Sequence, residues 1–333
     1  MSETRQRQQP DRNLALELVR ATEAAALAAG RWMGRNQKEA GDQAAVDAMR
    51  LLLSSVEMDG VVVIGEGEKD EAPMLFNGER IGTGNPPQVD IAVDPIDGTR
   101  LLAQGRPGSL AVIAMAPRGT MFDPGPMLYM EKWVVGEDAL GAMDIEAPVA
   151  ANLDAIARAK GKDVNDLVVI MLDRPRHDDL MREVRETGAR LRLIMDGDVA
   201  ASLLAILPDK NIDVLLGIGG TPEGVVSACA VQAIGGEMIG RLWARSDAEA
   251  ATARELGYDL DEPLTTDRLV RSRDTFFVCT GVTDGDLVEG VTYSRRGATT
   301  ESLVTRGKSG TLRTIKARHT FSKLMEYSSI DFE

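Results

Sequence analysis

Apolar positions recur with a helical period near the start of the chain and then gather in short runs. Between residues 14 and 33, and again between 42 and 56, they recur every three or four positions, which predicts two amphipathic helices. Apolar runs bounded by Gly and Pro follow, and they predict strands at about 61–65, 89–94, 109–116 and 130–135. We therefore expect the first half of the chain to be two helices packed on a sheet, an α+β arrangement.

The pattern changes at about residue 150, where predicted strands and helices begin to alternate. Helices are predicted over 152–160, 178–187, 199–207 and 222–234, with strands over 167–171, 191–195 and 212–216 between them. This alternation is typical of βαβ units on a mostly parallel sheet, an α/β arrangement. The tail, at about 275–320, is expected to form further strands and turns. We expect two domains, residues 1–150 and residues 151–333.

Acidic residues gather where two of the predicted strands end. One strand runs into Asp94-Pro95-Ile96-Asp97-Gly98-Thr99, where Pro95 opposes its simple continuation. Another runs into Gly65-Glu66-Gly67-Glu68-Lys69-Asp70. Hard oxygen ligands at the ends of adjacent strands are what Mg²⁺ or Mn²⁺ requires, so we hypothesise a metal cluster that handles phosphate. Taken singly, Asp94 and Asp97 are also typical of Asx turns, and Asp70 of a solvated loop.

Three further charged residues could join this cluster, and each has an ordinary alternative. Asp42 stands at the start of the second predicted helix, where capping is the usual role of aspartate. Lys38, four residues earlier, is either a phosphate contact or a surface lysine. Glu223 follows Gly-Gly-Thr-Pro at a predicted helix start, where free amides bind anions. It is either a further metal ligand or a residue that complements the helix dipole.

Polar residues also follow the predicted strands of the second half. They are Asp173-Arg174-Pro175-Arg176-His177, Asp196-Gly197-Asp198 and Gly217-Ile218-Gly219-Gly220. Because ligands of parallel sheets bind outside the carboxyl ends of the strands, these segments are candidates for a binding edge. The guanidinium groups of Arg174 and Arg176 suit bidentate contacts to phosphate, and surface solvation is the alternative. We expect His177 to be structural, and Tyr129 to pack in the core or at the rim of a site.

Composition narrows the classes of function. The 333 residues carry a formal net charge of −14, which argues against binding nucleic acid or an anionic membrane. An acidic protein that binds an anionic phosphate needs local compensation, which metal ions supply. With two histidines in the chain, carboxylates, hydroxyls and metal-activated water must carry proton transfers. Two cysteines in apolar surroundings and no apolar run near 20 residues lead us to expect a soluble cytoplasmic protein.

The motifs together resemble a known family. The pair Gly-Glu-Gly-Glu and Asp-Pro-Ile-Asp-Gly-Thr resembles the Mg²⁺-dependent, lithium-sensitive sugar and inositol phosphatases. A wider set, in unchanged order from about residue 14 to 320, is similar to the class II fructose-1,6-bisphosphatases. Its members are residues 38–42 (KEAGD), 64–75 (IGEGEKDEAPML), 92–99 (AVDPIDGT), 129–132 (YMEK), 175–178 (PRHD), 196–200 (DGDVA) and 217–228 (GIGGTPEGVVSA).

The resemblance implies a fold and a set of roles. The fold would be a layered αβαβα sandwich with a metal-binding N-terminal domain and a C-terminal domain that binds the sugar phosphate. Two or three Mg²⁺ or Mn²⁺ ions would be held by Asp42, Glu66, Asp94, Asp97 and Glu223. Lys38, Asp70 and Thr99 match catalytic positions. The substrate would contact Asp97, Gly98, Thr99, Tyr129, Arg174, Pro175, Arg176, Asp196, Gly197, Asp198 and Gly220. Some family members carry Glu where Asp97 stands, which leaves the metal preference open.

The implied reaction is hydrolysis of the C1 phosphate of fructose 1,6-bisphosphate to fructose 6-phosphate, a gluconeogenic step, by a homo-oligomer such as a dimer or tetramer. Sedoheptulose 1,7-bisphosphate is an additional or alternative substrate, because one extra hydroxymethylene changes binding by only about 1–3 kcal/mol. A non-catalytic phosphosugar-binding regulator on the same fold is the alternative from another class. A sugar kinase is disfavoured, since the sequence has no Walker-type phosphate-binding motif.

Overall fold

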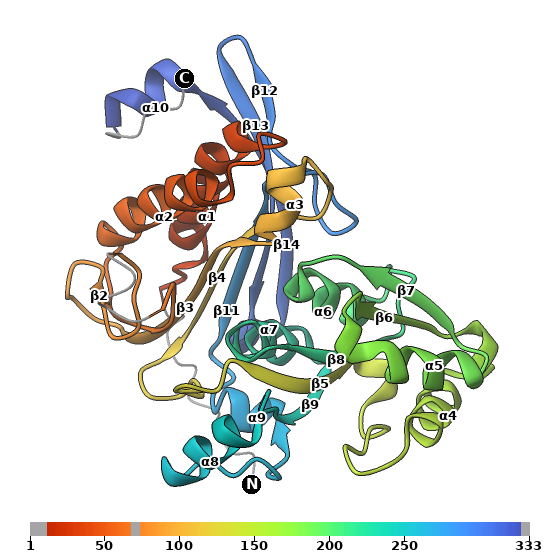
Figure 1. The fold of residues 1–333 in the computed structure, drawn as a ribbon. Coiled ribbons are helices and arrows are strands. Elements are labelled where there is room, and N and C mark those ends of the chain that lie inside the picture. The colour runs from red at the N-terminus through yellow and green to blue at the C-terminus, as the bar shows by residue number, and fades with distance from the viewer. Residues whose placement is uncertain (1–11, 68–73, 328–333) are drawn as a thin grey trace, which may run out of the picture.

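The computed structural model describes residues 12–67 and 74–327, and its elements stack in five layers (Figure 1). Helices α1 (Ala15–Ala29) and α2 (Lys38–Ser54) cover the outer face of a first sheet. Helices α6 (Asp198–Ile206) and α7 (Thr221–Ile234) lie between this sheet and a second one. Helices α4 (Val149–Lys160) and α5 (Asp178–Glu186) cover the far face of the second sheet. The predicted αβαβα sandwich is therefore confirmed.

The first sheet is mainly antiparallel. Its strand order is β12 (Thr292–Ser294), β13 (Gly297–Arg306), β11 (Phe276–Gly281), β4 (Leu110–Pro117), β3 (Gln88–Asp97), β1 (Asp59–Ile64) and β2 (Arg80–Ile81), with β14 (Thr311–Thr320) paired to β13. The pair β1–β3 is parallel, whereas the other pairs are antiparallel. Strands from both ends of the chain thus build one sheet.

The second sheet is mixed. Its order is β10 (Leu264–Thr265), β9 (Glu237–Leu242), β5 (Tyr129–Val135), β8 (Val214–Gly220), β6 (Val168–Leu172) and β7 (Arg190–Ile194). Strands β8, β6 and β7 are parallel, but β5, β9 and β10 join antiparallel, so the expectation of a mostly parallel sheet is wrong for half of it. Strand β5 precedes residue 150 but belongs to the second sheet, whereas β11 to β14 follow residue 150 but belong to the first. The sheets therefore do not divide the chain at residue 150, and the two-domain division stays a prediction.

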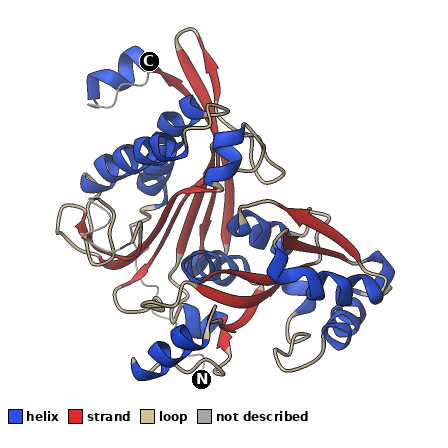
Figure 2. Ribbon diagram, in the orientation of Figure 1, coloured by secondary structure: helices blue, strands red, loops and turns tan. Residues whose placement is uncertain are grey.

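The remaining elements are short. They are the helices α3 (Thr99–Gln104), α8 (Asp247–Glu255), α9 (Thr266–Leu269) and α10 (Phe321–Tyr327), and the 3₁₀ turns η1 (Gly30–Trp32), η2 (Glu137–Ala139), η3 (Val164–Asp166), η4 (Pro175–His177) and η5 (Gly307–Ser309). Figure 2 shows how the helices surround and separate the strands of the two sheets. Within the described ranges, no helix is both long and apolar enough to cross a membrane.

Strand β4 is apolar throughout because both of its faces are buried. Its residues alternate between two cores: Leu110 and Val112 face the layer of α6 and α7, whereas Ala111 and Ile113 face α1 and α2. Strand β5 alternates in the same way, so that Met130 and Val134 face the inner helices and Trp133 faces α4 and α5. Each side chain on these strands therefore faces one particular layer, and alternate side chains reach the space between the two sheets.

Two predicted boundaries differ from the structure. Helix α2 begins at Lys38, one turn earlier than expected, so Asp42 lies inside the helix and does not cap it. Strand β3 continues through Pro95 to Asp97, although Pro95 was expected to end it. Its register against β4 shifts, since Asp94 pairs with Val112 and Asp97 with Leu110. This bulge accommodates the extra residue while it keeps both aspartates on one strand.

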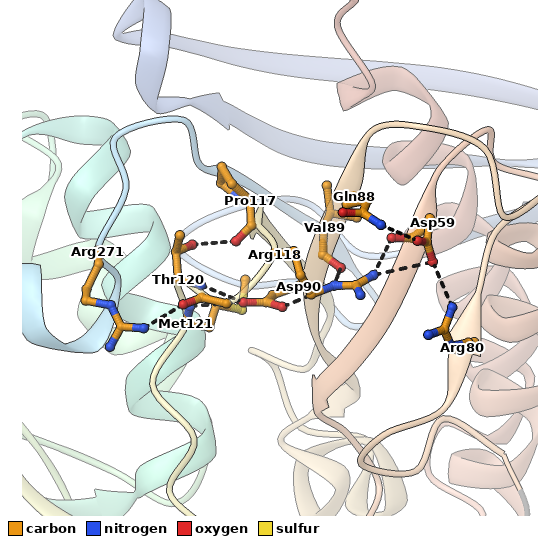
Figure 3. A network of polar contacts seen from close by, with 11 residues as sticks. Asp59, Arg80, Gln88, Val89, Asp90, Pro117, Arg118, Thr120, Met121 and Arg271 are labelled. Carbon is orange, nitrogen blue, oxygen red and sulfur yellow. Dashed lines mark hydrogen bonds and ion pairs between the residues drawn. The ribbon is translucent and has the colours of Figure 1, made fainter.

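A polar network fixes the opposite end of β3. The buried Asp90 carboxylate accepts hydrogen bonds from the backbone amides of Thr120 (2.9 Å) and Met121 (3.2 Å). The Arg118 guanidinium lies 3.6 Å from Asp90 and 3.4 Å from Asp59, and Figure 3 shows it between the two. Because removal of Arg118 would leave the buried Asp90 charge without its cation, this network holds β1, β3 and the loop after β4 together.

Candidate active site

A cavity of ≈490 Å³ opens between the two sheets, at the carboxyl ends of β1 and β3 on one side and of β6 and β8 on the other. The candidate residues that line it are Lys38, Asp42, Glu66, Asp94, Asp97, Gly98, Thr99, Tyr129, Arg174, Arg176, Asp196, Gly197, Asp198, Gly220 and Glu223. Pro175 does not line it and instead opens η4 between the two arginines. Asp70 lies outside the described residues, so its role stays a prediction.

The bulge in β3 presents two carboxylates to the cavity. Asp94 accepts a hydrogen bond from the Ile96 amide at 3.1 Å, so the Asx-type turn is present alongside any role in binding. The Asp97 carboxylate is buried, with 4% of the residue exposed, and the amide of Ala200 lies 3.4 Å from its Oδ2. The first sheet and the inner helix α6 are thus joined by a hydrogen bond at the floor of the site.

Two loops of similar sequence flank the cavity. Gly98 and Gly197 are the N-cap residues of α3 and α6, and both adopt the left-handed conformation, with φ of 84° and 86°. This conformation disfavours other residues and turns the chain so that Thr99 and Asp198 begin their helices at the cavity wall. Asp-Gly-Thr and Asp-Gly-Asp therefore serve as matched turns, one from each half of the molecule.

The start of α7 brings Glu223 back toward the cavity. Gly220 is the N-cap residue, and Pro222 stands in the first turn. A Cβ atom at Gly220 would overlap the Glu223 carboxylate, so a side chain at residue 220 would displace that carboxylate from its present position. The carboxylate lies within the positive end of the helix, as the sequence indicated, and still lines the cavity with Asp94 and Asp97.

Burial, and then the crowding of carboxylates, shifts their pKa values upward. Burial, with the charges of Asp42 and Glu223, raises the pKa of Glu66 to about 7. Burial and the charge of Asp198 raise the pKa of Glu223 to about 7. Burial raises the pKa of Asp42. The pKa values of Asp94 and Asp97 lie well above the usual range, mainly because of burial and then because of neighbouring carboxylates. Such a cluster takes up protons or cations.

These carboxylates fit a hard divalent cation by their chemistry. The donor set is Asp42, Glu66, Asp94, Asp97 and Glu223, all oxygen ligands of the kind that Mg²⁺ and Mn²⁺ prefer. Their pKa values are raised mainly by burial and then by the charges of neighbouring carboxylates, and bound cations would offset both effects. Among the residues that the structure describes, no three His, Cys, Asp or Glu side chains converge closely enough to hold one ion as they stand. The carboxylates surround the cavity as separate ligands, without forming a closed coordination shell.

A buried lysine that the sequence did not single out compensates part of this charge. Lys132, 1% exposed, is the largest of the fully buried side chains. Its Nζ lies 2.6 Å from Oδ2 of Asp198, a contact with the distance of an ion pair but without hydrogen-bond geometry, and donates to the Gly220 carbonyl at 3.2 Å. The alternation along β5 directs residue 132 to the same side as Met130, and this signal could have identified it.

The opposite wall is basic and aromatic. The Arg176 guanidinium carbon lies 5.2 Å from the centre of the Tyr129 ring, and that of Arg245 lies 5.6 Å from it. Trp243 packs edge-on against Tyr129, with ring centres 6.1 Å apart. Arg245 does not itself line the cavity; it was missed because only the pairing of β9 with β5 brings it to Tyr129, and no local pattern predicts that pairing.

The two predicted phosphate contacts are held in place by the backbone and by one carboxylate. Arg174 pairs with Asp196 at 3.2 Å, and Arg176 donates twice to the Ile218 carbonyl, at 3.1 and 2.7 Å. His177 is buried, and its Nε2 accepts from the Ile218 amide at 2.8 Å while Nδ1 donates to the Leu172 carbonyl at 2.7 Å. Both ring nitrogens are occupied, so His177 is structural, as expected.

Comparisons with known proteins identify the family of the chain. The profile of a family described as bacterial fructose-1,6-bisphosphatase, glpX-encoded, matches residues 12–319. The chain is 47% identical over 321 residues to the Escherichia coli (strain K12) protein named fructose-1,6-bisphosphatase 1 class 2, a match that covers 92% of this chain and 95% of that protein. Fructose-1,6-bisphosphatase class 2 of Shigella flexneri gives the same identity and coverage.

Among solved structures, the chain is similar to the extragenic suppressor protein suhB of Bartonella henselae. The sequences are 16% identical, the TM-score is 0.33, and the match covers 58% of this chain and 73% of that one. This likeness is remote, and the layer order above follows from the strand pairings and the packing of the helices.

Proposed function

The chain belongs to the family of bacterial, glpX-encoded fructose-1,6-bisphosphatases, and we propose that it removes the C1 phosphate of fructose 1,6-bisphosphate with the help of divalent cations. The products are fructose 6-phosphate and inorganic phosphate, which makes the reaction a gluconeogenic step. One observation carries the proposal: five carboxylates face two arginines and a tyrosine across a single cavity. A bisphosphate has one phosphate that reacts and one that does not, and the acidic and basic ends of the cavity suit these two different tasks.

The acidic end is where the reacting phosphate binds. Two or three Mg²⁺ or Mn²⁺ ions, held by the five carboxylates, would supply Lewis-acid stabilisation to the phosphate oxygens and make a water molecule more acidic. The charge of Lys38 offsets part of the rise in pKa that burial causes at Asp42 and Glu66, and Lys38 lines the cavity, where it would contact a phosphate oxygen. The Thr99 hydroxyl, at the first residue of α3, orients the attacking water, and Asp70 shares this role by family resemblance.

The basic end holds the phosphate that is not cleaved. Arg174 and Arg176 each have five N–H donors, of which their contacts to Asp173, Asp196 and Ile218 use only some. The remaining donors suit the distal phosphate, while Tyr129 and the 196–198 loop contact the sugar. Binding energy from that remote phosphate orients the reacting one, which raises the rate of the chemical step.

Phosphate release with product identification tests this function. The protein is incubated with fructose 1,6-bisphosphate and MgCl₂, MnCl₂ or a chelator, and fructose 6-phosphate is measured with a coupled isomerase and dehydrogenase. We expect release of one phosphate per sugar with either metal and none with chelator. Fructose 1-phosphate as product, or no release by folded protein with either metal, would overturn the proposal. Parallel assays with sedoheptulose 1,7-bisphosphate and inositol 1-phosphate define the substrate range.

We also propose that the chain acts as a cytoplasmic homo-oligomer. The outer helical layer leaves large apolar side chains in solvent: Leu16 of α1 is 64% exposed, Leu51 of α2 is 38% exposed, and Met33 is 50% exposed. Such side chains stabilise an interface where they gather into one patch, and oligomers of this size are commonly symmetric. Light scattering of the purified protein tests this. A dimer or tetramer that Leu16→Lys converts to a monomer is expected, and a wild-type monomer would contradict it.

A further inference from the structure

A second cavity, of ≈320 Å³, adjoins the catalytic cavity and has no role in the proposed reaction. Asp196 and Gly197 line both cavities, so the turn before α6 forms their common wall. The second cavity is bounded by residues from both sheets and their connections. Leu101 of α3 and Leu110 of β4 contribute from the side of the first sheet, and Ile170 of β6 contributes from the second. A ligand in this cavity would therefore contact elements of both sheets at once.

The interior of this second cavity is apolar. Ile194 and Leu287 face it and are only partly covered by the main core, and Leu193 is 37% exposed. Leu204 and Ala201 of α6 complete the apolar wall. Enclosed apolar walls that remain open to solvent on one side are the usual surroundings of small-molecule ligands. The ligand should therefore have an apolar body.

Among the described residues, Arg106 at the rim of the second cavity forms no ion pair with a carboxylate. Arg192 pairs with Asp286, whose backbone carbonyl also accepts from Lys210 at 2.9 Å. The Arg106 guanidinium, by contrast, donates to the thioether sulfur of Met195 at 2.8 Å, and sulfur is a weak acceptor. An anionic group that replaced the sulfur would form a charge-assisted hydrogen bond, which is considerably stronger.

The common wall offers a route from this cavity to the catalytic carboxylates. Ala200 lines the second cavity, and its amide lies 3.4 Å from Oδ2 of Asp97 in the first. Asp198, at the start of the same helix, pairs with the buried Lys132. A ligand packed against the first turn of α6 would thus act on the two carboxylates that this turn positions.

We propose that the second cavity binds a small amphipathic monoanion, with an apolar body and one carboxylate or sulfonate group, and that its occupancy changes ligand affinity in the catalytic cavity. The apolar body lies between Leu110 and Leu204, and the anionic group pairs with Arg106. The binding step is independent of the proposed function. The coupling between the cavities rests on it, because it concerns the affinity for a sugar phosphate.

Fluorescence titration with 8-anilinonaphthalene-1-sulfonate tests the binding step, since this probe is an aromatic monoanion that brightens in apolar surroundings. We expect saturable binding of one probe per chain. Arg106→Gln should weaken it by about tenfold, because a charge-assisted hydrogen bond is lost. Leu287→Trp should weaken probe binding similarly, because the larger side chain fills the cavity. Arg313→Gln is the control: it removes an exposed arginine on β14 that lines neither cavity, and it should leave probe binding unchanged. Circular dichroism checks that each variant is folded.

The same titration, repeated with saturating fructose 6-phosphate and MgCl₂, tests the coupling. We expect the affinity of the wild-type protein for the probe to change by about fivefold or more, and linkage requires the probe to change sugar-phosphate affinity by the same factor. Equal probe binding by the wild type and both cavity variants would overturn the site. Cavity-specific binding that the sugar phosphate leaves unchanged would overturn the coupling. An inactive protein that binds the probe as described would count only against the proposed function.

Discussion

Lys132 and Asp198 form an ion pair of 2.6 Å within the wall of the catalytic cavity, with side chains only 1% and 8% exposed. The pair links β5 to the first residue of α6 and lies beside the Gly220 carbonyl. The charge of Lys132 also lowers the pKa of Glu223, whose neighbours otherwise raise it. A single buried cation thus supports the 196–198 loop and a candidate metal ligand at once.

We predict that Lys132→Met destabilises the protein by about 3–5 kcal/mol, because it leaves the Asp198 carboxylate buried without a partner. The double variant Lys132→Met, Asp198→Asn should recover part of this loss, since no uncompensated charge remains. Urea unfolding of the wild type, both single variants and the double variant measures the coupling. Strictly additive losses in the double variant would show that the two side chains do not interact.

Arg245 should contribute to substrate affinity through Tyr129. Its guanidinium lies 5.6 Å from the ring centre but is 53% exposed and paired with Glu249, so the contribution should be modest. We predict that Arg245→Ala raises KM for fructose 1,6-bisphosphate about three- to fivefold, with little change in kcat. Glu249→Ala is the matched control, since it removes the ion pair and keeps the cation. An unchanged KM in Arg245→Ala argues against this role.

Glu23 of α1, which does not line the catalytic cavity, makes the free energy of unfolding depend on pH. It accepts a hydrogen bond from Thr300 at 3.2 Å and faces His319 at 3.9 Å and the charge of Arg20. Burial raises the pKa of Glu23 to about 7, against an ordinary value of 4.5. Between these values the folded state keeps a proton that the unfolded state has released. The contribution of Glu23 to stability therefore falls as pH rises from about 4.5 to about 7.

We predict that Glu23→Gln stabilises the protein at pH 8 by about 1–3 kcal/mol and has little effect near pH 4.5. The glutamine keeps an acceptor for Thr300 and removes the charge. Chemical denaturation at both pH values measures the difference. Glu186→Gln, at a 69% exposed position on α5, should change stability little at either pH. A gain of equal size at both pH values would exclude ionisation of Glu23 as its cause.

The network at the start of β3 should contribute to stability without affecting catalysis. Arg118 is 30% exposed and lies between Asp90 and Asp59 (Figure 3), at the end of β3 opposite Asp94. We predict that Arg118→Ala costs about 2–3 kcal/mol, because the buried Asp90 loses its charged partner. Arg80→Ala, which removes a 77% exposed partner of Asp59, should cost less than about 0.5 kcal/mol.

Thermal unfolding of the two arginine variants, with activity measured well below the transition, checks this comparison. Both variants should keep the wild-type kcat, since neither side chain lines the catalytic cavity. Equal destabilisation by the two substitutions would mean that the burial of Asp90 does not decide the cost.

The sequence predicted elements and site residues best where the pattern of neighbouring residues alone determines them. The apolar run of β4 and the carboxylates at the end of β3 follow from residues that are neighbours in the chain. Strand order could not be predicted, because the pairing of β11 with β4 joins residues more than 150 positions apart, and no local period encodes it. For the same reason Arg245 was missed, since only the β5–β9 pairing brings it to Tyr129.

Lys132 was missed for a different reason. A lysine in a strand usually marks an exposed position in a sheet with one wet face, and this outweighed the alternation with Met130 and Val134, which directs residue 132 toward the inner helices. The start of α2 was misplaced because Asp42 looks like a cap, whereas the helix begins at Lys38 without a side-chain cap. Tertiary packing decided both positions.

The central claim, that divalent cations held by the carboxylate cluster act on the reacting phosphate, is tested most directly at Asp94, which is buried among the acidic neighbours Asp97, Glu66 and Asp42. Calorimetric titration with MnCl₂ and phosphate release from fructose 1,6-bisphosphate are measured on the same preparations of wild type and Asp94→Asn, with folding checked by circular dichroism. We predict that the variant stays folded, binds at least one Mn²⁺ fewer per chain, and loses at least about 100-fold in kcat/KM. A folded variant that keeps the wild-type Mn²⁺ stoichiometry and rate would contradict the claim.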